Sequence, residues 1–199
     1  MVFAKAPTPG RVKSRLVPAL GEQAAAALHR QLAERTLCTA LAAGPGQVEL
    51  WCAPATDDAF FAACANRHGV GLRAQGEGDL GVRMARALDY ALAEGSPALL
   101  IGSDCPALTP AYLREAAAAL LGGNDAVIGP AEDGGYVLIG LARGPAAPLF
   151  EEISWGSTAV MQQTRARLSG LNWRWRELAT LWDVDRPEDL SRLARLRSE

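Results

Sequence analysis

The chain reads Ala98-Leu99-Leu100-Ile101-Gly102-Ser103-Asp104-Cys105-Pro106 at its most apolar point. The first four residues carry no polar side chain, which is typical of a central strand in a parallel sheet that is covered on both faces. Asp104 follows shortly after and is therefore expected at the carboxyl end of that strand. Open α/β folds bind their ligands at this edge of the sheet. The stretch predicts both an α/β fold and an acidic group at its binding edge.

Strand-like and helix-like segments alternate on both sides of this run, a pattern typical of βαβ units and a mostly parallel sheet. Strands are expected at 1–5, 48–52, 70–74, 98–101, 126–128 and 137–139. Helices are expected at 22–43, 57–67, 80–94, 109–121, 157–168 and 187–197. The alternating stretch 173–178 is interpreted either as an edge strand or as a contact in a homodimer. Since no linker or internal repeat is visible, the pattern predicts a single domain over 1–199.

The composition is that of an ordinary globular protein, with 49% hydrophobic and 21% charged residues. A formal net charge of −2 without a basic run argues against nucleic acid as a partner. No apolar stretch reaches the roughly 18 residues of a membrane span, so no membrane contact is expected. The four cysteines lack a C-x-x-C spacing and are expected to be buried thiols of a cytoplasmic protein. His29 and His68 are expected at the surface or at helix ends.

A loop rich in positive charge follows the first expected strand. It reads Lys5-Ala6-Pro7-Thr8-Pro9-Gly10-Arg11-Val12-Lys13-Ser14-Arg15-Leu16, and its two lysines are the only ones among 20 basic residues. A compact ammonium group suits a phosphate oxygen, whereas arginine presents a planar fork. Because Lys5, Arg11, Lys13 and Arg15 lie so close in sequence, the loop predicts a binding turn for a small polyphosphate. Lys13 is expected to bind phosphate and to matter little for folding.

Acidic residues at two places are candidates for a metal site. Asp104 would face the basic loop, and proteins usually hold Mg²⁺ with one or two carboxylates plus substrate phosphates. A turn-forming role before Pro106 is the alternative for this residue. Asp183 and Asp185 point the same way on an extended chain, so either one is a candidate second ligand. Asp185 and Glu188 also have the spacing of a helix cap, and that alternative stays open.

Glycine-containing segments supply the remaining candidates. The segment Asp133-Gly134-Gly135-Tyr136 predicts a place where backbone approaches a ligand closely, with a hairpin turn as the alternative. Trp155 covers either a ligand or the core. The segment Gly76-Glu77-Gly78-Asp79-Leu80-Gly81 matches a dinucleotide fingerprint, but it follows the third strand and carries two acidic residues. We therefore expect this segment to contact a base or a ribose instead.

In chain order, these pieces form five motifs that cover nearly the whole sequence. They are Lys5-x-Pro7-x-x-Gly10-x-x-Lys13-Ser14-Arg15-Leu16, Gln75-Gly76-x-Gly78-x-Leu80-Gly81-x-Arg83-Met84, Gly102-x-Asp104-x-Pro106, Gly129-Pro130-x-x-Asp133-Gly134-Gly135-Tyr136 and Trp155-Gly156-Ser157-Thr158. The set resembles the DUF2064 family, also called radical-SAM/selenodomain-associated transferase 1, of the nucleotide-diphospho-sugar transferase superfamily. The resemblance implies a GT-A-like fold, a three-layer α/β/α domain with a mostly parallel mixed sheet.

The resemblance also implies a reaction class. The first loop, the Asp-x-Pro turn and the closing Asp183-Val184-Asp185-Arg186-Pro187-Glu188-Asp189-Leu190 are similar to 2-phospholactate and molybdenum-cofactor guanylyltransferases, which transfer a nucleotidyl group from a nucleoside triphosphate. Those enzymes often begin with a glycine-rich loop, whereas this chain has Pro7, Pro9 and Gly10 there. The superfamily name points instead to glycosyl transfer from a nucleotide sugar.

The implied roles follow from these likenesses. Four cations suit a triphosphate, so nucleotidyl transfer with Mg²⁺ or Mn²⁺ to a small phosphorylated or hydroxyl acceptor is preferred. Glycosyl transfer and non-catalytic nucleotide binding are the alternatives. The expected catalytic residues are Lys13, Arg15, Asp104 and Asp133, and the expected metal ligands are Asp104 with Asp183 or Asp185. The nucleotide is expected on Lys5, Gly10, Arg11, Ser14, Gln75, Gly78 and Arg83, and the acceptor on Gly134, Gly135, Tyr136 and Trp155.

Overall fold

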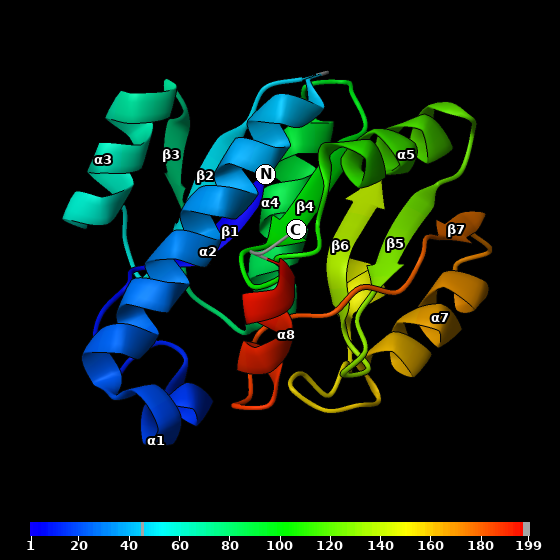
Figure 1. Cartoon of the computed structure of the whole chain (residues 1–199). Helices are drawn as coiled ribbons and strands as arrows, with labels where there is room; N and C mark the ends of the chain where they lie inside the picture. Colours follow the sequence, from blue (N-terminus) through cyan, green and yellow to red (C-terminus); the bar gives the residue numbers. More distant parts are fainter. Residues whose placement is uncertain (45, 197–199) are drawn as a thin grey trace.

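The computed structural model describes residues 1–44 and 46–196 of the chain. Its centre is a seven-stranded sheet with the strand order β3-β2-β1-β4-β6-β5-β7 (Figure 1). The strands are β1 (Val2–Lys5), β2 (Glu49–Ala53), β3 (Gly71–Ala74), β4 (Ala98–Gly102), β5 (Ala126–Pro130), β6 (Tyr136–Leu141) and β7 (Trp175–Glu177). Strand β6 runs antiparallel to both of its neighbours, whereas the other pairs are parallel. The mostly parallel mixed sheet is confirmed.

Helices cover both faces of this sheet. They are η1 (Ser14–Leu16), α1 (Val17–Leu20), α2 (Glu22–Ala43), α3 (Ala59–His68), α4 (Leu80–Leu92), α5 (Pro110–Leu121), α6 (Ala147–Phe150), α7 (Val160–Gly170) and α8 (Asp189–Leu196). One hydrophobic cluster joins α2, α3 and α5 to the sheet, and a second joins α4, α6 and α7 to the opposite face. This arrangement is the predicted three-layer α/β/α architecture.

Most expected elements form close to the expected residues because their hydrophobic patterns are long. Helix α2 spans the predicted range, and α5 begins after Thr109, whose side chain accepts the amide of Tyr112 at 3.2 Å. Helix α7 begins three residues later than predicted because Ser157 closes a turn first, its Oγ accepting the amide of Ala159. The short helices η1, α1 and α6 were not predicted, since a single turn shows no period. The stretch 173–178 contains an edge strand, β7, parallel to β5.

A third hydrophobic cluster brings the C-terminal segment to the first helices. Leu16 and Leu28 pack with Trp182, Val184 and Leu193 in this cluster. The amide of Val184 donates to the backbone carbonyl of Asp104 at 2.9 Å. The stretch 182–184 is therefore fixed across the carboxyl end of β4, beside the predicted acidic group.

Some surface expectations are corrected by burial. Cys52, Cys64 and Cys105 are buried as predicted, but Cys38 is exposed. His68 ends α3 as expected, whereas His29 lies in the middle of α2 and is buried, so the expectation for His29 is wrong. Within residues 1–44 and 46–196, no helix has the length and apolar character to cross a lipid bilayer.

Candidate functional site

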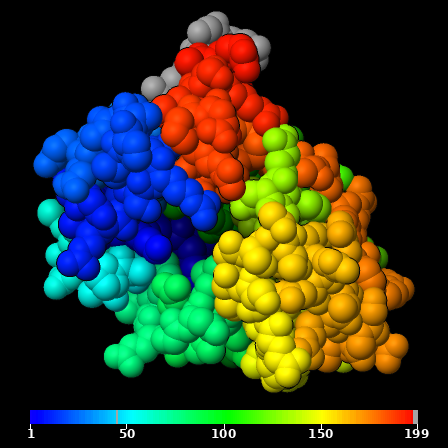
Figure 2. All heavy atoms as spheres, turned by 90° about the horizontal axis from the view of Figure 1, so that it is seen from below, coloured from blue at the N-terminus to red at the C-terminus, as the bar shows by residue number. Residues whose placement is uncertain are grey.

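The candidate site lies at the carboxyl edge of the parallel strands. Figure 2 looks onto this edge and shows a hollow between the first loop (blue), the C-terminal segment (red), the segment before α7 (yellow) and the start of α4 (green). The loop after β1 supplies Lys13, and the turn after β4 supplies Asp104. These two side chains come together although 90 residues separate them in sequence, which is what the parallel topology predicts for this edge.

Lys13 is buried at the centre of this edge. Its Nζ lies 2.8 Å from Oδ1 of Asp104 and donates to the backbone carbonyl of Val184 at 2.6 Å. Its side chain is only 3% exposed. Its backbone has a φ of 50°, a left-handed conformation that costs an L-residue about 1–2 kcal/mol. Lys13 therefore fixes Asp104 and the C-terminal stretch, and the expectation that it matters little for folding is corrected.

Asp104 presents its two carboxylate oxygens to different surroundings. Oδ1 is enclosed by Lys13 and His29, yet the side chain as a whole is 45% exposed. The exposed part therefore includes Oδ2, which is free to meet a ligand. Burial acts to raise the pKa of Asp104, but the interactions with His29 and Lys13 outweigh it and hold the pKa well below its usual range. Asp104 is thus a fixed anion across the working pH range.

His29 is a site residue that the sequence interpretation missed. Its Nε2 lies 3.0 Å from the backbone carbonyl oxygen of Lys5, and because that oxygen only accepts, Nε2 carries the hydrogen. Its Nδ1 lies 3.6 Å from Oδ1 of Asp104. The ring thus lies between the start of the first loop, to which it is hydrogen-bonded, and the acidic turn, which it only approaches. The available signal was its place in α2 among the buried positions Ala25, Ala26, Leu28, Leu32 and Ala33.

Asp183 and Asp185 have different environments, which separates the two candidates. Burial, and then the like charges of Asp133 and Asp104, raise the pKa of Asp183 to about 6. Asp185 instead forms an exposed ion pair with Arg15. Asp183 is thus close enough to Asp104 and Asp133 to feel their charges, whereas Asp185 is paired with Arg15. Asp183 is therefore the better candidate for the second ligand.

The helix-capping alternative for this segment is also resolved. Oδ2 of Asp189 accepts the amides of Asp185 and Arg186 at 2.9 and 2.7 Å. The side chain that caps this helix start is therefore that of Asp189, one residue after Glu188, and not the predicted pair Asp185 and Glu188. Asp183 is left without a capping role.

The first loop keeps several cations at its surface. Lys5 and Arg11 are exposed and make no ion pair within the described residues. The side chain of Arg15 is 60% exposed, so its pair with Asp185 is weak enough to open for an anion. Gly10 and Ser14 are exposed beside them. Three of the four predicted cations are therefore accessible to a phosphate group.

Gln75 organises the neighbouring loop from inside. Its Nε2 donates to the carbonyl of Trp51 in β2 at 2.9 Å and to that of Ala4 in β1 at 3.3 Å. Its Oε1 accepts from Arg83 at 3.1 Å. Because Gln75 is buried, it positions Arg83, and only the arginine has atoms left for a nucleotide. Arg86, a residue that sequence reasoning missed, closes the loop by donating to the carbonyl of Gln75 at 2.7 Å.

A pocket of about 440 Å³ extends from Asp183 toward α7. Its lining includes Gly135, Tyr136 and Trp155 of the predicted acceptor set and the predicted catalytic residue Asp133, whereas Gly134 of that set does not line it. The rings of Tyr136 and Trp155 meet edge to face with centroids 6.4 Å apart. The Tyr136 hydroxyl is buried beside Thr164, and burial raises its pKa, so the ring rather than the hydroxyl faces a ligand.

Close backbone packing explains two glycines of the predicted motifs. Gly134 forms the β5–β6 hairpin with a φ of +91°, and a Cβ there would lie 2.5 Å from the carbonyl oxygen of Thr158. A Cβ on Gly81 would lie 2.8 Å from the ring of Trp155 and 3.0 Å from Phe150. The hairpin alternative for 133–136 is thus correct, and the same hairpin forms the pocket wall. Gly81 lets α4 approach Trp155, so its predicted role near a base is indirect.

Replacing Gly81 by alanine is expected to destabilise the protein by about 1–3 kcal/mol, because the methyl group overlaps Trp155 and Phe150. A chain of this size loses about 2–4 °C in melting temperature per kcal/mol, so calorimetry resolves the change. Gly170→Ala is the matched control, since a Cβ there meets nothing within 4 Å. Equal melting temperatures for the two variants would contradict the tight contact.

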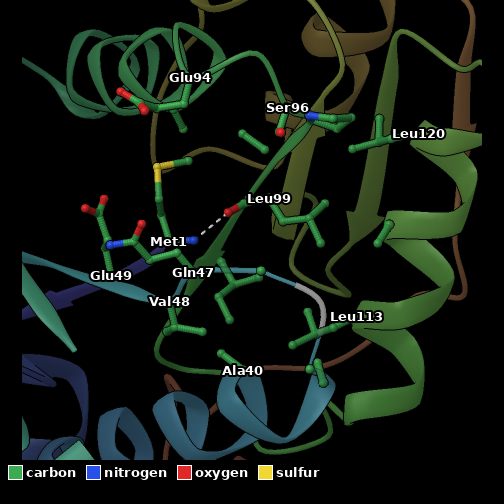
Figure 3. Close-up of a pocket in the computed structure, with 18 of the residues that line it drawn as sticks. Met1, Ala40, Gln47, Val48, Glu49, Glu94, Ser96, Leu99, Leu113 and Leu120 are labelled. Carbon is green, nitrogen blue, oxygen red and sulfur yellow. Dashed lines mark hydrogen bonds between the residues drawn. The ribbon is translucent and has the colours of Figure 1, made fainter. Parts of the chain in front are cut away.

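A second pocket, of about 560 Å³, lies at the opposite edge of the sheet (Figure 3). Its walls are mostly apolar, with Val48, Leu99, Leu113 and Leu120 among them. The terminal ammonium group of Met1 donates to the carbonyl of Leu99 there at 2.7 Å. Glu49, Glu94 and the Met1 ammonium group also line this pocket, but none of the predicted site residues does, so the smaller pocket is the candidate site.

The acidic residues form an incomplete metal site. Among the residues that the structure describes, no group of three His, Cys, Asp or Glu side chains has the spacing of a preformed metal centre. Asp104 nevertheless offers Oδ2, and Asp183 is a partly buried carboxyl whose pKa is raised first by burial and then by the charges of Asp133 and Asp104, a cost that a divalent cation would relieve. Two carboxylates of this kind fit Mg²⁺ or Mn²⁺ when phosphate oxygens complete the shell.

Residues 36–157 match the family described as an uncharacterized protein conserved in bacteria, DUF2064. A proposed nucleotide-diphospho-sugar transferase from Desulfovibrio desulfuricans G20 is 33% identical, with a TM-score of 0.88 over 98% of this chain and 85% of that chain. No curated protein matches the chain.

Two more distant structures share the fold. A nucleotidyl transferase from Methanothermobacter thermautotrophicus is 17% identical, with a TM-score of 0.65 over 100% of this chain and 97% of that one. Rv0371c from Mycobacterium tuberculosis H37Rv, in complex with manganese, is 22% identical, with a TM-score of 0.54 over 98% and 96%. With a family model over 36–157 and a 33% identical relative over nearly its whole length, the chain belongs to the DUF2064 family and has the nucleotide-diphospho-sugar transferase fold.

Proposed function

We propose that this protein is a nucleotidyltransferase that uses a divalent cation and transfers a nucleotidyl group from a nucleoside triphosphate to a small acceptor. The observation that carries the proposal is the Asp104 carboxylate, fixed by Lys13 at 2.8 Å and open at its other oxygen. The first loop adds the exposed cations Lys5, Arg11 and Arg15, and Arg15 also lines the acceptor pocket. The names of the structural relatives support the same broad class, nucleotide-dependent transferases.

The chain's own residues divide the work in this proposal. Lys5, Arg11 and Arg15 bind the phosphates, because they are exposed and free or only weakly paired. Asp104 and Asp183 hold the cation, and the manganese complex of Rv0371c, which shares the fold, supports a divalent cation in this role. A bound Mg²⁺ supplies positive charge that neutralises the phosphates and orients them. Lys13 holds Asp104 in place, and Arg83 is the candidate contact for the base or ribose.

Transfer at phosphorus needs positioning and neutralisation of charge more than a covalent contribution from the protein. The site supplies both, because backbone groups hold its charged side chains in place. On one side, the carbonyl of Val184 accepts a hydrogen bond from Lys13. The β5–β6 hairpin sets Asp133, whose Oδ1 accepts the amide of Gly135 at 2.9 Å. The other oxygen of Asp133 is then free to accept a proton from the acceptor hydroxyl.

Glycosyl transfer from a nucleotide sugar is the second candidate. The name of the 33% identical relative favours it. The ion pair of Lys13 with Asp104 favours it as well, because only three of the four cations of the first loop are then left to bind phosphates, fewer than a triphosphate would suit. The same carboxylates would hold the cation in that reaction. The two reactions differ in the nucleotide that binds.

A thermal-shift panel separates these candidates. The four nucleoside triphosphates and the common nucleotide sugars are each added with and without Mg²⁺. Nucleotidyl transfer predicts that a triphosphate with Mg²⁺ raises the melting temperature most, since a ligand at about 100 times its dissociation constant adds about 2.7 kcal/mol. A larger rise with a nucleotide sugar would select glycosyl transfer, and no rise with either would reject nucleotide binding.

The first loop provides a variant for the same panel. Arg11→Ala is expected to weaken binding of the triphosphate by about tenfold, because it removes one charged contact worth about 1.5 kcal/mol, without lowering stability. Arg35→Ala, on an exposed position of α2, is the matched control. Titration calorimetry measures both affinities, and unchanged binding by Arg11→Ala would contradict the phosphate role of the loop.

A further inference from the structure

The acceptor pocket has a charge pattern that specifies its ligand, provided that the proposed function holds. We infer that the acceptor is an uncharged polyhydroxyl compound of sugar size, and not a phosphorylated or otherwise anionic one. The inference rests on which polar groups of the 440 Å³ pocket already form hydrogen bonds or ion pairs within the protein and which are left to bind a ligand.

The features that would bind a phosphate on the acceptor are occupied. Helix α7 points its first turn at the pocket, and a helix start binds anions only through free amides. Here the amide of Ala159 donates to Oγ of Ser157, that of Val160 to the carbonyl of Ser157, and that of Met161 to the carbonyl of Gly134. These amides of α7 are thus bonded within the protein.

The second helix start at the pocket is used in the same way. The backbone amides of Asp185 and Arg186, just before α8, both donate to the carboxylate of Asp189. Arg15 lines the pocket, but Asp185 is its partner there. In the transfer reaction Arg15 would turn to the nucleotide phosphates, which leaves Asp185 as a further negative charge on the acceptor side.

The charged groups that remain in the pocket are the carboxylates of Asp133 and Asp183 and, at the rim, the guanidinium group of Arg186. Asp133 has one oxygen beyond the one bonded to Gly135, and Asp183, which the proposed function assigns to the cation, lines the same pocket. Ionised carboxylates only accept, so they pair with hydroxyl donors and repel a second anion. Beside them the rings of Trp155 and Tyr136 form an apolar wall, which suits the C–H face of a sugar.

The bond changes are the same for any hydroxyl acceptor. The hydroxyl oxygen bonds to the α-phosphorus as the bond from that phosphorus to the bridging oxygen of pyrophosphate breaks. The proton of the hydroxyl passes to Asp133, and pyrophosphate leaves with the electron pair. The products are a nucleotidyl phosphodiester of the acceptor, pyrophosphate and one proton.

The test uses a bacterial small-molecule extract as the source of acceptors. The extract is split on ion exchangers into anionic, cationic and neutral fractions, and each is incubated with the full-length protein, Mg²⁺ and nucleoside triphosphates labelled at the α-phosphorus. The inference expects the labelled product from the neutral fraction. A product that arises only from the anionic or only from the cationic fraction would overturn it. No product from the unfractionated extract would reject the proposed transfer itself, which distinguishes the two failures.

Two variants give a second measurement once a fraction supports transfer. Asp133→Asn is expected to raise the acceptor KM at least tenfold while the nucleotide KM stays within twofold. Arg186, at the pocket rim, makes no ion pair in the described part of the chain and is the one cation that could hold an anionic acceptor. Arg186→Ala is expected to leave the acceptor KM within twofold, and a tenfold rise would overturn the inference.

Discussion

Asparagine in place of Asp104 is expected to lower the Mg²⁺-dependent affinity for nucleotide by about 100-fold and to destabilise the protein at once. The first effect follows because the exposed Oδ2 is the proposed metal ligand. The second follows because Lys13, whose side chain is 3% exposed, would lose its only anionic partner among the described residues. Breaking a buried ion pair on one side costs about 3 kcal/mol, and less here because Asp104 is partly exposed.

A double variant separates the two effects. In Lys13→Met with Asp104→Asn no buried charge is left unpaired, so stability is expected to recover by about 1–2 kcal/mol relative to Asp104→Asn alone. Metal-dependent binding is expected to stay lost. Urea unfolding gives the stabilities, and calorimetric titration with Mg²⁺ gives the affinities. Glu115→Gln, which breaks an exposed ion pair with Arg176, is the control that should change neither.

Two results would count against this account. If Asp104→Asn keeps its Mg²⁺ response, the carboxylate does not hold the cation. If the double variant is as unstable as Asp104→Asn, the loss of stability has a cause other than the unpaired ammonium group of Lys13. Because the readouts are independent, either part of the explanation can fail alone.

The fold was accessible from sequence because its elements have long or strongly apolar patterns. Strand β4 is a run of apolar residues in the centre of the sheet, and α2 is an Ala- and Leu-rich helix without a break. The antiparallel direction of β6 was not specified by its own residues, since the short hairpin at 131–135 reverses the chain. The helices α1 and α6 are too short for their period to be read.

The site was accessible only in outline. Parallel topology brings a loop after β1 and a turn after β4 to one edge, so the meeting of Lys13 with Asp104 follows from the fold class. The direction in which a side chain points does not follow from it. Lys13 turns inward because its backbone is left-handed and Val184 offers a carbonyl, and neither is visible in the sequence.

His29 illustrates the same limit from the other direction. Its neighbours on α2 are apolar, so its burial could be predicted from the helical period, but its partner Asp104 lies 75 residues away in sequence. The choice between Asp183 and Asp185 likewise needed coordinates, because the ion pair of Asp185 with Arg15 depends on how the last segment crosses β4. Long-range contacts thus decide the roles that local patterns leave open.

Asparagine in place of Asp183 is expected to make the protein more stable above pH 6 while it removes metal-dependent binding. Burial and the charges of Asp133 and Asp104 raise the pKa of this carboxyl from 3.8 to about 6. A raised carboxyl pKa means that the native state binds the proton more tightly, so ionisation lowers stability as pH rises between these two values. Because Asp183 is only partly buried, we expect the gain from removing its charge to be about 1–2 kcal/mol at pH 7.5.

The pH dependence makes the result specific. Below about pH 3 Asp183 is protonated in both the native and the unfolded protein, so the variant and the natural protein should unfold at the same urea concentration. The difference should grow up to pH 6 and then stay constant, and saturating Mg²⁺ with nucleotide should stabilise the natural protein alone. A variant that is less stable at pH 7.5, or that gains as much at pH 4, would show that Asp183 is a structural residue. If Asp183→Asn is more stable than the natural protein only at high pH, the negative charge of Asp183 lowers stability and is kept because the ligand requires it.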